Sequence, residues 1–297
     1  MTTATGNFAE LLWPGIREIW GNTYNDYKSL YTQVFETVTS DRAFEKYQGV
    51  TGLPLAGIKD QGDSIPYVDP FQGFQKEFVN QTFALGSQVT REMYEDDQYN
   101  YINGLPKMLA RSARQTEETI AWNVINNAFN ANFTGADGSI LLVATHPLVG
   151  GGTYSNLLAT ASDLTQTSFE VMVQMIMDAV DDQQLKINLT PKTLCVPTAI
   201  AIRAEKILTS DLVSGSNDND KNVVRGKCSL VVSPWLTDND AWFITTDCPN
   251  GLIWQNRRPI AFDRDQHFDT ETLKFKMSWR SQCSWVDPRS LYGTPGA

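Results

Sequence analysis

An extended segment interrupted by glycine and proline constrains this chain more than any other feature. The interrupting residues between 49 and 86 are Gly49, Gly52, Pro54, Gly57, Gly62, Pro66, Pro70 and Gly73. They separate short apolar runs such as 65–68 and 76–85, which predicts a long twisted hairpin with Lys59 near its tip. Because an isolated two-stranded ribbon is marginally stable in water, we expect this hairpin to lean on another surface.

A segment with helical periodicity follows the hairpin. Apolar residues in 92–129 recur at steps of three and four, which is the spacing of one helix face. Proline removes a hydrogen-bond donor and breaks a continuous helix. Since Gly104 and Pro106 fall inside the pattern, we expect a kink or a restart there and a long rod over 105–130.

The first forty residues form an apolar arm. Their spacing predicts short amphipathic helices separated at Gly21 and Asn22. Such an arm either folds back on its own core or is buried against a neighbouring subunit.

The part of the chain after Pro191 has an α/β pattern. It predicts strands at 193–196, 229–232 and 242–245, and a helix at 198–208. An earlier helix is cued by Ser162 and Asp163, and strict alternation over 273–279 predicts a half-buried strand.

Charge and length limit the classes of function. The 297 residues suit one or two linked cores, and 24 basic against 34 acidic residues give a net charge of −10. Binding DNA requires clustered cations, so a dedicated nucleic-acid surface is not expected. A basic leader with an apolar run is missing, as is any run of about 18 apolar residues, so we expect a soluble protein made in the cytosol.

Residues that could carry chemistry are few and scattered. Cys195, Cys228, Cys248 and Cys283 lack a Cys-x-x-Cys pair and are expected to be buried free thiols. His146 and His267 lie far apart, and we expect them to order a loop and a turn.

The segment 217–220 departs from a calcium loop at Val223 and Ser229, and the pairs Asp96–Asp97 and Asp181–Asp182 are expected to be solvated or capping groups. No nucleotide-binding or acyl-transfer motif occurs, so no catalytic residue, metal or cofactor is predicted.

Two groups of residues carry a family resemblance. The first comprises Gly86, Val89-Thr90-Arg91-Glu92, Glu95-Asp96-Asp97, Arg111-Ser112-Ala113, Glu117 and His146-Pro147. The second comprises Pro191-Lys192-Thr193-Leu194-Cys195-Val196-Pro197 and the alanine-rich helix that runs to Leu208. Through them the chain resembles the major head subunits of tailed bacteriophages, especially the Mu-type head subunit family.

The resemblance implies an α+β capsid fold with four regions. Residues 1–48 would be an N-terminal arm, and residues 49–90 an extended loop. Residues 91–190 would form a peripheral domain with a spine helix, completed by return strands in 262–297, and residues 191–261 would form an α/β axial domain. The pattern of the residues alone predicts the same order of elements.

The resemblance also implies the function and the partners. Copies of the chain would assemble into hexamers and pentamers, forming an icosahedral head that encloses a double-stranded DNA genome. A portal and scaffold or cementing proteins are further expected partners, with no cofactor, no membrane and no sequence-specific nucleic-acid binding. Assembly would take place in the host cytoplasm, and the product would be part of the virion.

Aromatic residues in the arm and the loop are the candidate contacts between subunits. They are Trp13, Trp20, Phe71, Phe74 and Phe78. Aromatic side chains give much buried area at a small entropic cost, so we expect them to anchor neighbouring subunits. Lys59 raises the idea of the Lys–Asn isopeptide bond of some relatives of this fold, although a solvated or salt-bridging lysine is the default expectation.

Three rival functions remain open at this point. An encapsulin-type compartment would share the fold but enclose enzymes. An α/β hydrolase-like or metal-dependent enzyme would use Asp and His residues in a pocket with perturbed acids, whereas a shell subunit would have flat complementary edges. A tail protein would form tubes or rings.

Overall fold

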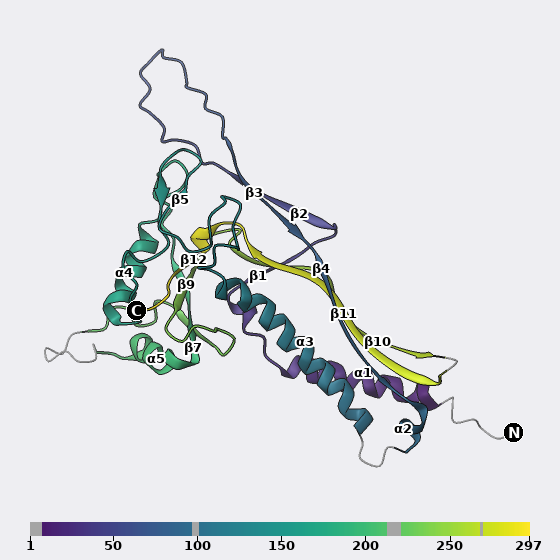
Figure 1. Ribbon diagram of the computed structural model, residues 1–297. Helices are drawn as coiled ribbons and strands as arrows, with labels where there is room; N and C mark the ends of the chain where they lie inside the picture. Colours follow the sequence, from purple (N-terminus) through teal and green to yellow (C-terminus); the bar gives the residue numbers. More distant parts are fainter. Residues whose placement is uncertain (1–7, 97–100, 213–220, 268–269) are drawn as a thin grey trace.

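The computed structural model describes residues 8–96, 101–212, 221–267 and 270–297, and its chain forms two parts (Figure 1). In the elongated part, a long β-hairpin runs beside two helices. The rounder part holds a second sheet with two further helices. A loop projects beyond both parts from the end of a separate pair of strands. The mixture of helices and largely antiparallel strands confirms the predicted α+β class.

The elongated part is built on a four-stranded sheet in the order β1-β10-β11-β4. Its strands are β1 (Glu36–Thr39), β4 (Gln81–Val89), β10 (Leu252–His267) and β11 (Thr272–Trp285). β10 and β11 are antiparallel from Leu252 opposite Trp285 to His267 opposite Thr272. The strand predicted at 273–279 is therefore confirmed as half of a longer hairpin, whose other half the sequence pattern does not predict.

Helices α1 (Phe8–Asp26) and α3 (Tyr101–Asn126) pack beside this sheet. α1 continues through Gly21 and Asn22, so the prediction of two short helices separated there is wrong. Trp20 and Tyr24 lie one turn apart across this point, and their rings stack at a centroid distance of 5.1 Å. This packing outweighs the helix-propensity penalty of about 1 kcal/mol for glycine.

The spine helix α3 also runs without a break. It begins at Tyr101 and contains Pro106, so a restart of the helix there is wrong, whereas the long rod is confirmed. The first four N–H groups of a helix have no partner inside it, and Pro106 removes one donor shortly after them. Leu105 and Leu109 on either side are buried in the core, which holds this turn in place. The short helix α2 (Arg91–Glu95) precedes it.

The rounder part holds a second four-stranded sheet in the order β12-β9-β7-β8. Its strands are β7 (Pro191–Pro197), β8 (Ser229–Ser233), β9 (Trp242–Thr246) and β12 (Leu291–Thr294), and its helices are α4 (Gln166–Met177) and α5 (Ala201–Thr209), the latter preceded by η3 (Thr198–Ile200). The predicted strands and the helix at 198–208 are confirmed. α4 is capped by Thr165 rather than by Ser162 or Asp163, because the Thr165 hydroxyl accepts the Ser168 N–H.

The sheets divide the chain differently from the expected domain boundaries. β10 crosses the expected boundary at 261 as one continuous strand, and β12 lies in the second sheet although it falls within 262–297. Phe169 and Met172 of α4, which were assigned to 91–190, pack in the core of that second sheet. Contacts between residues distant in sequence set the division into two sheets, which differs from the boundaries that the family resemblance implies.

The predicted hairpin is shorter and begins earlier than expected. β2 (Phe44–Val50) pairs with β3 (Gln72–Val79), from Phe44 opposite Val79 to Val50 opposite Gln72. Residues 51–71, all of which the structure describes, contain no helix or strand. The run 76–85 is divided at Asn80, because β3 pairs with β2 whereas β4 joins the first sheet. Asn80 itself is buried, and its side-chain oxygen accepts a hydrogen bond from Gln255 at 2.8 Å.

Four short elements complete the fold: η2 (Tyr31–Gln33), β5 (His146–Pro147), β6 (Thr153–Tyr154) and η4 (Pro288–Ser290). The four cysteines are free thiols, as expected. Cys195, Cys228 and Cys283 are buried, as expected, whereas Cys248 is only half-buried. Among the described residues, no helix combines the length and the apolar character needed to cross a lipid bilayer.

Candidate assembly surfaces

The loop 51–71 exposes an unusual number of apolar side chains. They are Leu53, Leu55, Ile58, Ile65, Tyr67, Val68 and Phe71. Ile58 is 101% exposed and Tyr67 is 93% exposed, so the subunit itself gives these side chains almost no cover. So many exposed apolar side chains on one segment indicate a contact site. Figure 1 shows the loop projecting from the ends of β2 and β3, away from both sheets.

The base of this loop is tightly closed. The Thr51 N–H donates to the carbonyl oxygen of Phe71 at 3.0 Å, and the Phe71 N–H donates to the Thr51 hydroxyl at 2.8 Å. Gly73 faces Gly49 across the strand pair, and a Cβ on Gly73 would lie 2.8 Å from the carbonyl carbon of Gly49. The middle of the loop is therefore exposed, whereas its two ends are held in place where they join β2 and β3.

A shallow groove beside the spine helix is the second candidate surface. Its volume is about 320 Å³, and it lies between α3, β4, β11 and the segment that follows α3. The apolar side chains in its lining include Phe83, Ile120, Val124 and Phe133. The Lys76 ammonium group lies at its edge, donates to the carbonyl oxygen of Thr134 at 2.7 Å and sits 5.4 Å from the Trp285 ring. The groove thus offers an apolar floor with a cation at its rim.

Two buried carboxylates on α3 hold the arm against the spine. Glu118 accepts hydrogen bonds from the Leu30 N–H at 2.6 Å and from the Trp122 indole at 2.8 Å. Glu117 accepts from the Tyr24 hydroxyl at 2.9 Å and from Arg114 at 3.0 Å. Burial raises the pKa of both carboxyl groups. In this structure, residues 16–35 of the arm therefore fold back on their own subunit.

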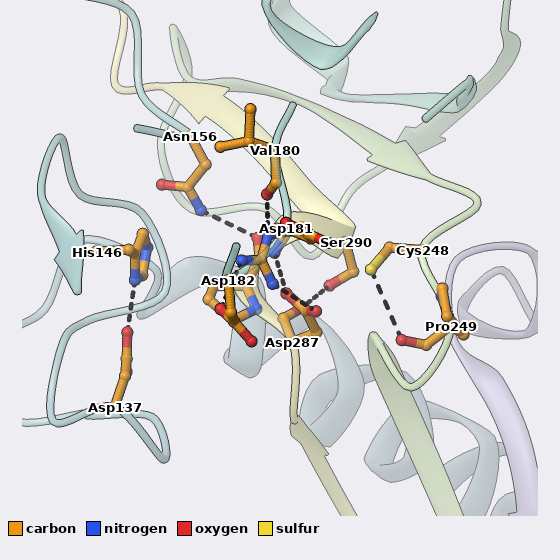
Figure 2. A network of polar contacts seen from close by, with 12 residues as sticks. Asp137, His146, Asn156, Val180, Asp181, Asp182, Cys248, Pro249, Asp287 and Ser290 are labelled. Atoms are coloured by element: carbon orange, nitrogen blue, oxygen red, sulfur yellow. Dashed lines mark hydrogen bonds and ion pairs between the residues drawn. The ribbon is translucent and has the colours of Figure 1, made fainter. Parts of the chain in front are cut away.

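Arg289 forms a polar centre behind the base of the loop. Its guanidinium group donates to the Val180 carbonyl oxygen at 2.9 Å, to Asp182 at 3.0 Å and to Asp287 at 3.1 Å. It also lies over the Tyr154 ring at 4.6 Å. Figure 2 shows Val180 and Asp182, from the segment after α4, and Asp287, from the segment before η4, converging on this centre. One side chain thereby joins η4, the segment after α4 and β6.

His146 has a structural role, as the sequence analysis expects. It is fully buried, its Nδ1 lies 2.7 Å from Asp137, and its ring stacks on Tyr154 at 4.9 Å (Figure 2). The other candidates for chemistry give little support to an enzyme. Asp181 accepts two backbone N–H groups and Asp182 binds Arg289, so this pair is engaged in structure. Asp97, residues 217–220 and the His267 side chain lie outside the described residues.

The predicted aromatic anchors fall into two groups. Trp20 is 8% exposed and stacks on Phe262, and Phe78 is 1% exposed, so the prediction that they anchor a neighbour is wrong for this conformation. Phe78 lies between the exposed Glu77 and Val79 on β3, whereas Trp20 faces the core from α1, and both side chains are covered by the subunit itself. Phe71 is 65% exposed and Phe74 is 37% exposed, so both present surface to a neighbour, as does the exposed Lys59. The Trp13 side chain lies outside the described residues.

Sequence reasoning missed Arg289 and Glu118. Arg289 follows Asp287 and Pro288, and a cap residue followed by proline is a recognisable helix start that could have drawn attention to it. Glu118 carries no such signal, because its partner Leu30 is 88 residues away.

Comparison with known proteins shows which family this chain matches. Residues 75–293 match the family described as phage capsid protein. The major capsid protein of Escherichia phage Mu is 25% identical over 222 residues, which cover 71% of this chain and 70% of that protein.

Solved structures agree with the fold. A capsid of a native GTA particle has a TM-score of 0.60 at 12% identity, with 91% of each chain covered. A structure from Microbacterium phage Oxtober96 has a TM-score of 0.58 at 9% identity, covering 91% of this chain and 92% of the other. The architecture is therefore that of a phage capsid subunit.

The chain belongs to the phage capsid protein family. It is a major capsid subunit that forms the shell of a phage head, as the resemblance to Mu-type head subunits predicted. The match favours the phage head over the rival compartment shell, enzyme and tail protein. It begins at residue 75, so what the arm and the loop 51–71 do has to be argued from their structure.

Proposed function

We propose that subunits join into hexamers and pentamers when the loop 51–71 of one copy lies in the groove beside the spine helix of the next. The observation that carries this proposal is the near-complete exposure of Ile58 and Tyr67 in a loop whose base is fixed. A fully buried Ile or Phe side chain contributes about 1.5–3 kcal/mol, so several such residues suffice to drive association. A contact between two different surfaces can repeat from copy to copy and forms a closed ring when the rotation between copies closes.

The two parts of the subunit have separate roles under this proposal. The elongated part, with the first sheet, α1 and α3, serves as the peripheral domain. The rounder part, with the second sheet, α4 and α5, serves as the axial domain near the centre of each capsomer. The exposed Ile202 and Val223 of the rounder part support a contact surface there.

The remaining expectations follow from the same role. The shell encloses double-stranded DNA, and the net charge of −10 favours a wall to which the genome does not adhere. A portal and scaffold or cementing proteins complete the head during assembly in the host cytoplasm. The role is mechanical, so the protein needs neither a catalytic residue nor a cofactor.

The test compares assembly of loop and control variants. The purified chain and its Ile58→Ser, Tyr67→Ser double variant are separated by size exclusion and imaged by negative-stain electron microscopy. We expect capsomers or shells from the parent and unassembled subunits from the double variant. Val171→Ser, which changes an exposed residue of α4, serves as the matched control and should assemble normally. Normal assembly of the double variant would contradict the proposed contact.

A further inference from the structure

Two adjacent acidic residues connect the Arg289 centre to the base of the loop 51–71. Asp182 faces inward and accepts a hydrogen bond from the Arg289 guanidinium group at 3.0 Å. Asp181 faces the loop, because a Cβ on Gly52 would lie 2.9 Å from its free carboxylate oxygen. The other oxygen of Asp181 accepts the Gln183 and Leu185 N–H groups, each at 2.8 Å, so the carboxylate cannot easily move away.

The base of the loop also borders a small cavity at this centre. The cavity has a volume of about 80 Å³. Its lining includes Gly49, Gly73 and Phe74 from the base of the loop together with Asp182, Asp287 and Arg289. The last residues of β2 and the first of β3 therefore form a wall of the same site in which Arg289 is held. Movement of that site would reach the loop through both this wall and Asp181.

Arg289 suits the task of holding the segment 180–182. Its side chain is 10% exposed, and it donates hydrogen bonds to both ends of this segment, Val180 and Asp182. A further hydrogen bond, to Asp287, holds the guanidinium group in place. The planar guanidinium group offers donors in several fixed directions, which a lysine ammonium group cannot reproduce. Loss of these donors would leave the Val180 carbonyl oxygen and the Asp182 carboxylate without this partner.

We propose that Arg289 is a positioning residue for assembly. Through Asp182 and the adjacent Asp181, it fixes the base of the loop 51–71, so that the loop leaves the subunit in one direction. This inference rests on the proposed function, in which that loop contacts the neighbouring subunit. In this account the polar contacts of residues 180–182 and Arg289 set the direction of the loop. The apolar side chains of the loop supply its affinity for the neighbouring subunit.

Hydrogen–deuterium exchange in unassembled full-length subunits tests the inference. The variants are Arg289→Lys and Asp182→Ala, the second of which changes a side chain that is 22% exposed and spares the hydrophobic core. We expect backbone amides in peptides covering 49–53 and 71–75 to exchange at least tenfold faster in both, while peptides from β10 and β11 stay unchanged. The matched control is Asp178→Ala, which removes an exposed ion pair to Lys186 in the same region and should leave residues 49–53 and 71–75 unchanged.

Each outcome decides the inference. Faster exchange confined to β9 and β12, with the base of the loop unchanged in both variants, would overturn it and leave Arg289 with a role in the second sheet alone. If Arg289→Lys fails to fold, Asp182→Ala gives the same two outcomes. Assembly yield is measured in parallel: a loosened base with a normal yield of shells would also overturn the inference, because assembly would then not depend on the direction of the loop. The proposed function is judged separately by the Ile58→Ser, Tyr67→Ser variant, whose normal assembly would contradict the loop contact itself.

Discussion

The carboxylate of Glu118 accepts the backbone N–H of Leu30 at 2.6 Å and so ties the arm to the spine helix across 88 residues of sequence. The same carboxylate accepts the Trp122 indole N–H one turn further along α3. The Trp122 indole is buried in a hydrophobic core that also includes Tyr31, and the partly buried Leu30 packs against this core. The arm of this subunit is thus held by polar contacts as well as by apolar packing.

Replacing Glu118 with alanine should lower the free energy of unfolding by about 3 kcal/mol, because two buried donors lose their acceptor. Urea denaturation of unassembled subunits measures the change. Glu205→Ala, which changes an exposed glutamate on α5, is the matched control and should differ from the parent by about 0.5 kcal/mol or less. Equal stabilities of the two variants would show that the arm is not held through Glu118.

The stability of the subunit should depend on the protonation of Glu117. Burial raises its pKa in the folded state above the ordinary value of 4.5. The folded state therefore holds this proton more tightly than the unfolded state does, and the group's contribution to stability falls as pH rises through the range just above 4.5. In Glu117→Gln this contribution is absent, so the stability of the parent relative to the variant should decrease as the pH rises from 4 towards neutrality. A constant difference across that range, measured by urea denaturation, would contradict the assignment.

Gly73→Ala should disturb the pairing of β2 and β3, because the new Cβ would lie 2.8 Å from the backbone of Gly49. We expect a loss of about 1–3 kcal/mol in the free energy of unfolding or a displaced hairpin. Gly104→Ala is the control. A Cβ there meets no atom within 4 Å, and alanine is a better helix former by about 1 kcal/mol, so this variant should be as stable as the parent or more so. Similar stabilities for the two variants would mean that the close approach is not restrictive.

Trp20→Ala tests whether this residue belongs to the core or to an intersubunit contact. Trp20 stacks on Tyr24 and Phe262 inside the subunit, so its removal should cost about 3–5 kcal/mol even when subunits are unassembled. Thermal unfolding at a concentration too low for assembly measures this. An unchanged melting temperature together with a loss of shells would restore the role of intersubunit anchor.

The sequence predicts β7, β8 and β9 of the second sheet but not β12, and it predicts little of the first sheet. β7 and β9 are buried along most of their length, so their apolar runs are visible in the sequence. β10 carries Arg257, Arg258 and Pro259 at the place where its register with β11 shifts, and this interruption hides its alternation. The break predicted in α1 at Gly21 and Asn22 does not occur. The packing of Trp20 and Tyr24 outweighs the low helix propensity of these two residues, and this packing cannot be seen from local sequence.

The candidate site was predictable only in part. The glycine and proline residues of 49–73 indicate an exposed extended loop, and the structure confirms that Phe71 and Phe74 are accessible there. Sequence pattern does not show that Phe78, on the same segment, turns inward to contact Tyr47. The helix start at Asp287 and Pro288 could have drawn attention to Arg289, but its partner Val180 could not be predicted, because it is 109 residues away.

The central claim is that the loop 51–71 of one subunit lies in the groove beside α3 of the next. Cryo-electron microscopy of shells assembled from the full chain tests it most directly. The account predicts Ile58 and Tyr67 in contact with Ile120, Val124 or Phe133 of a neighbouring copy. A closed shell in which this loop folds over its own subunit, or extends into solvent, would contradict the claim.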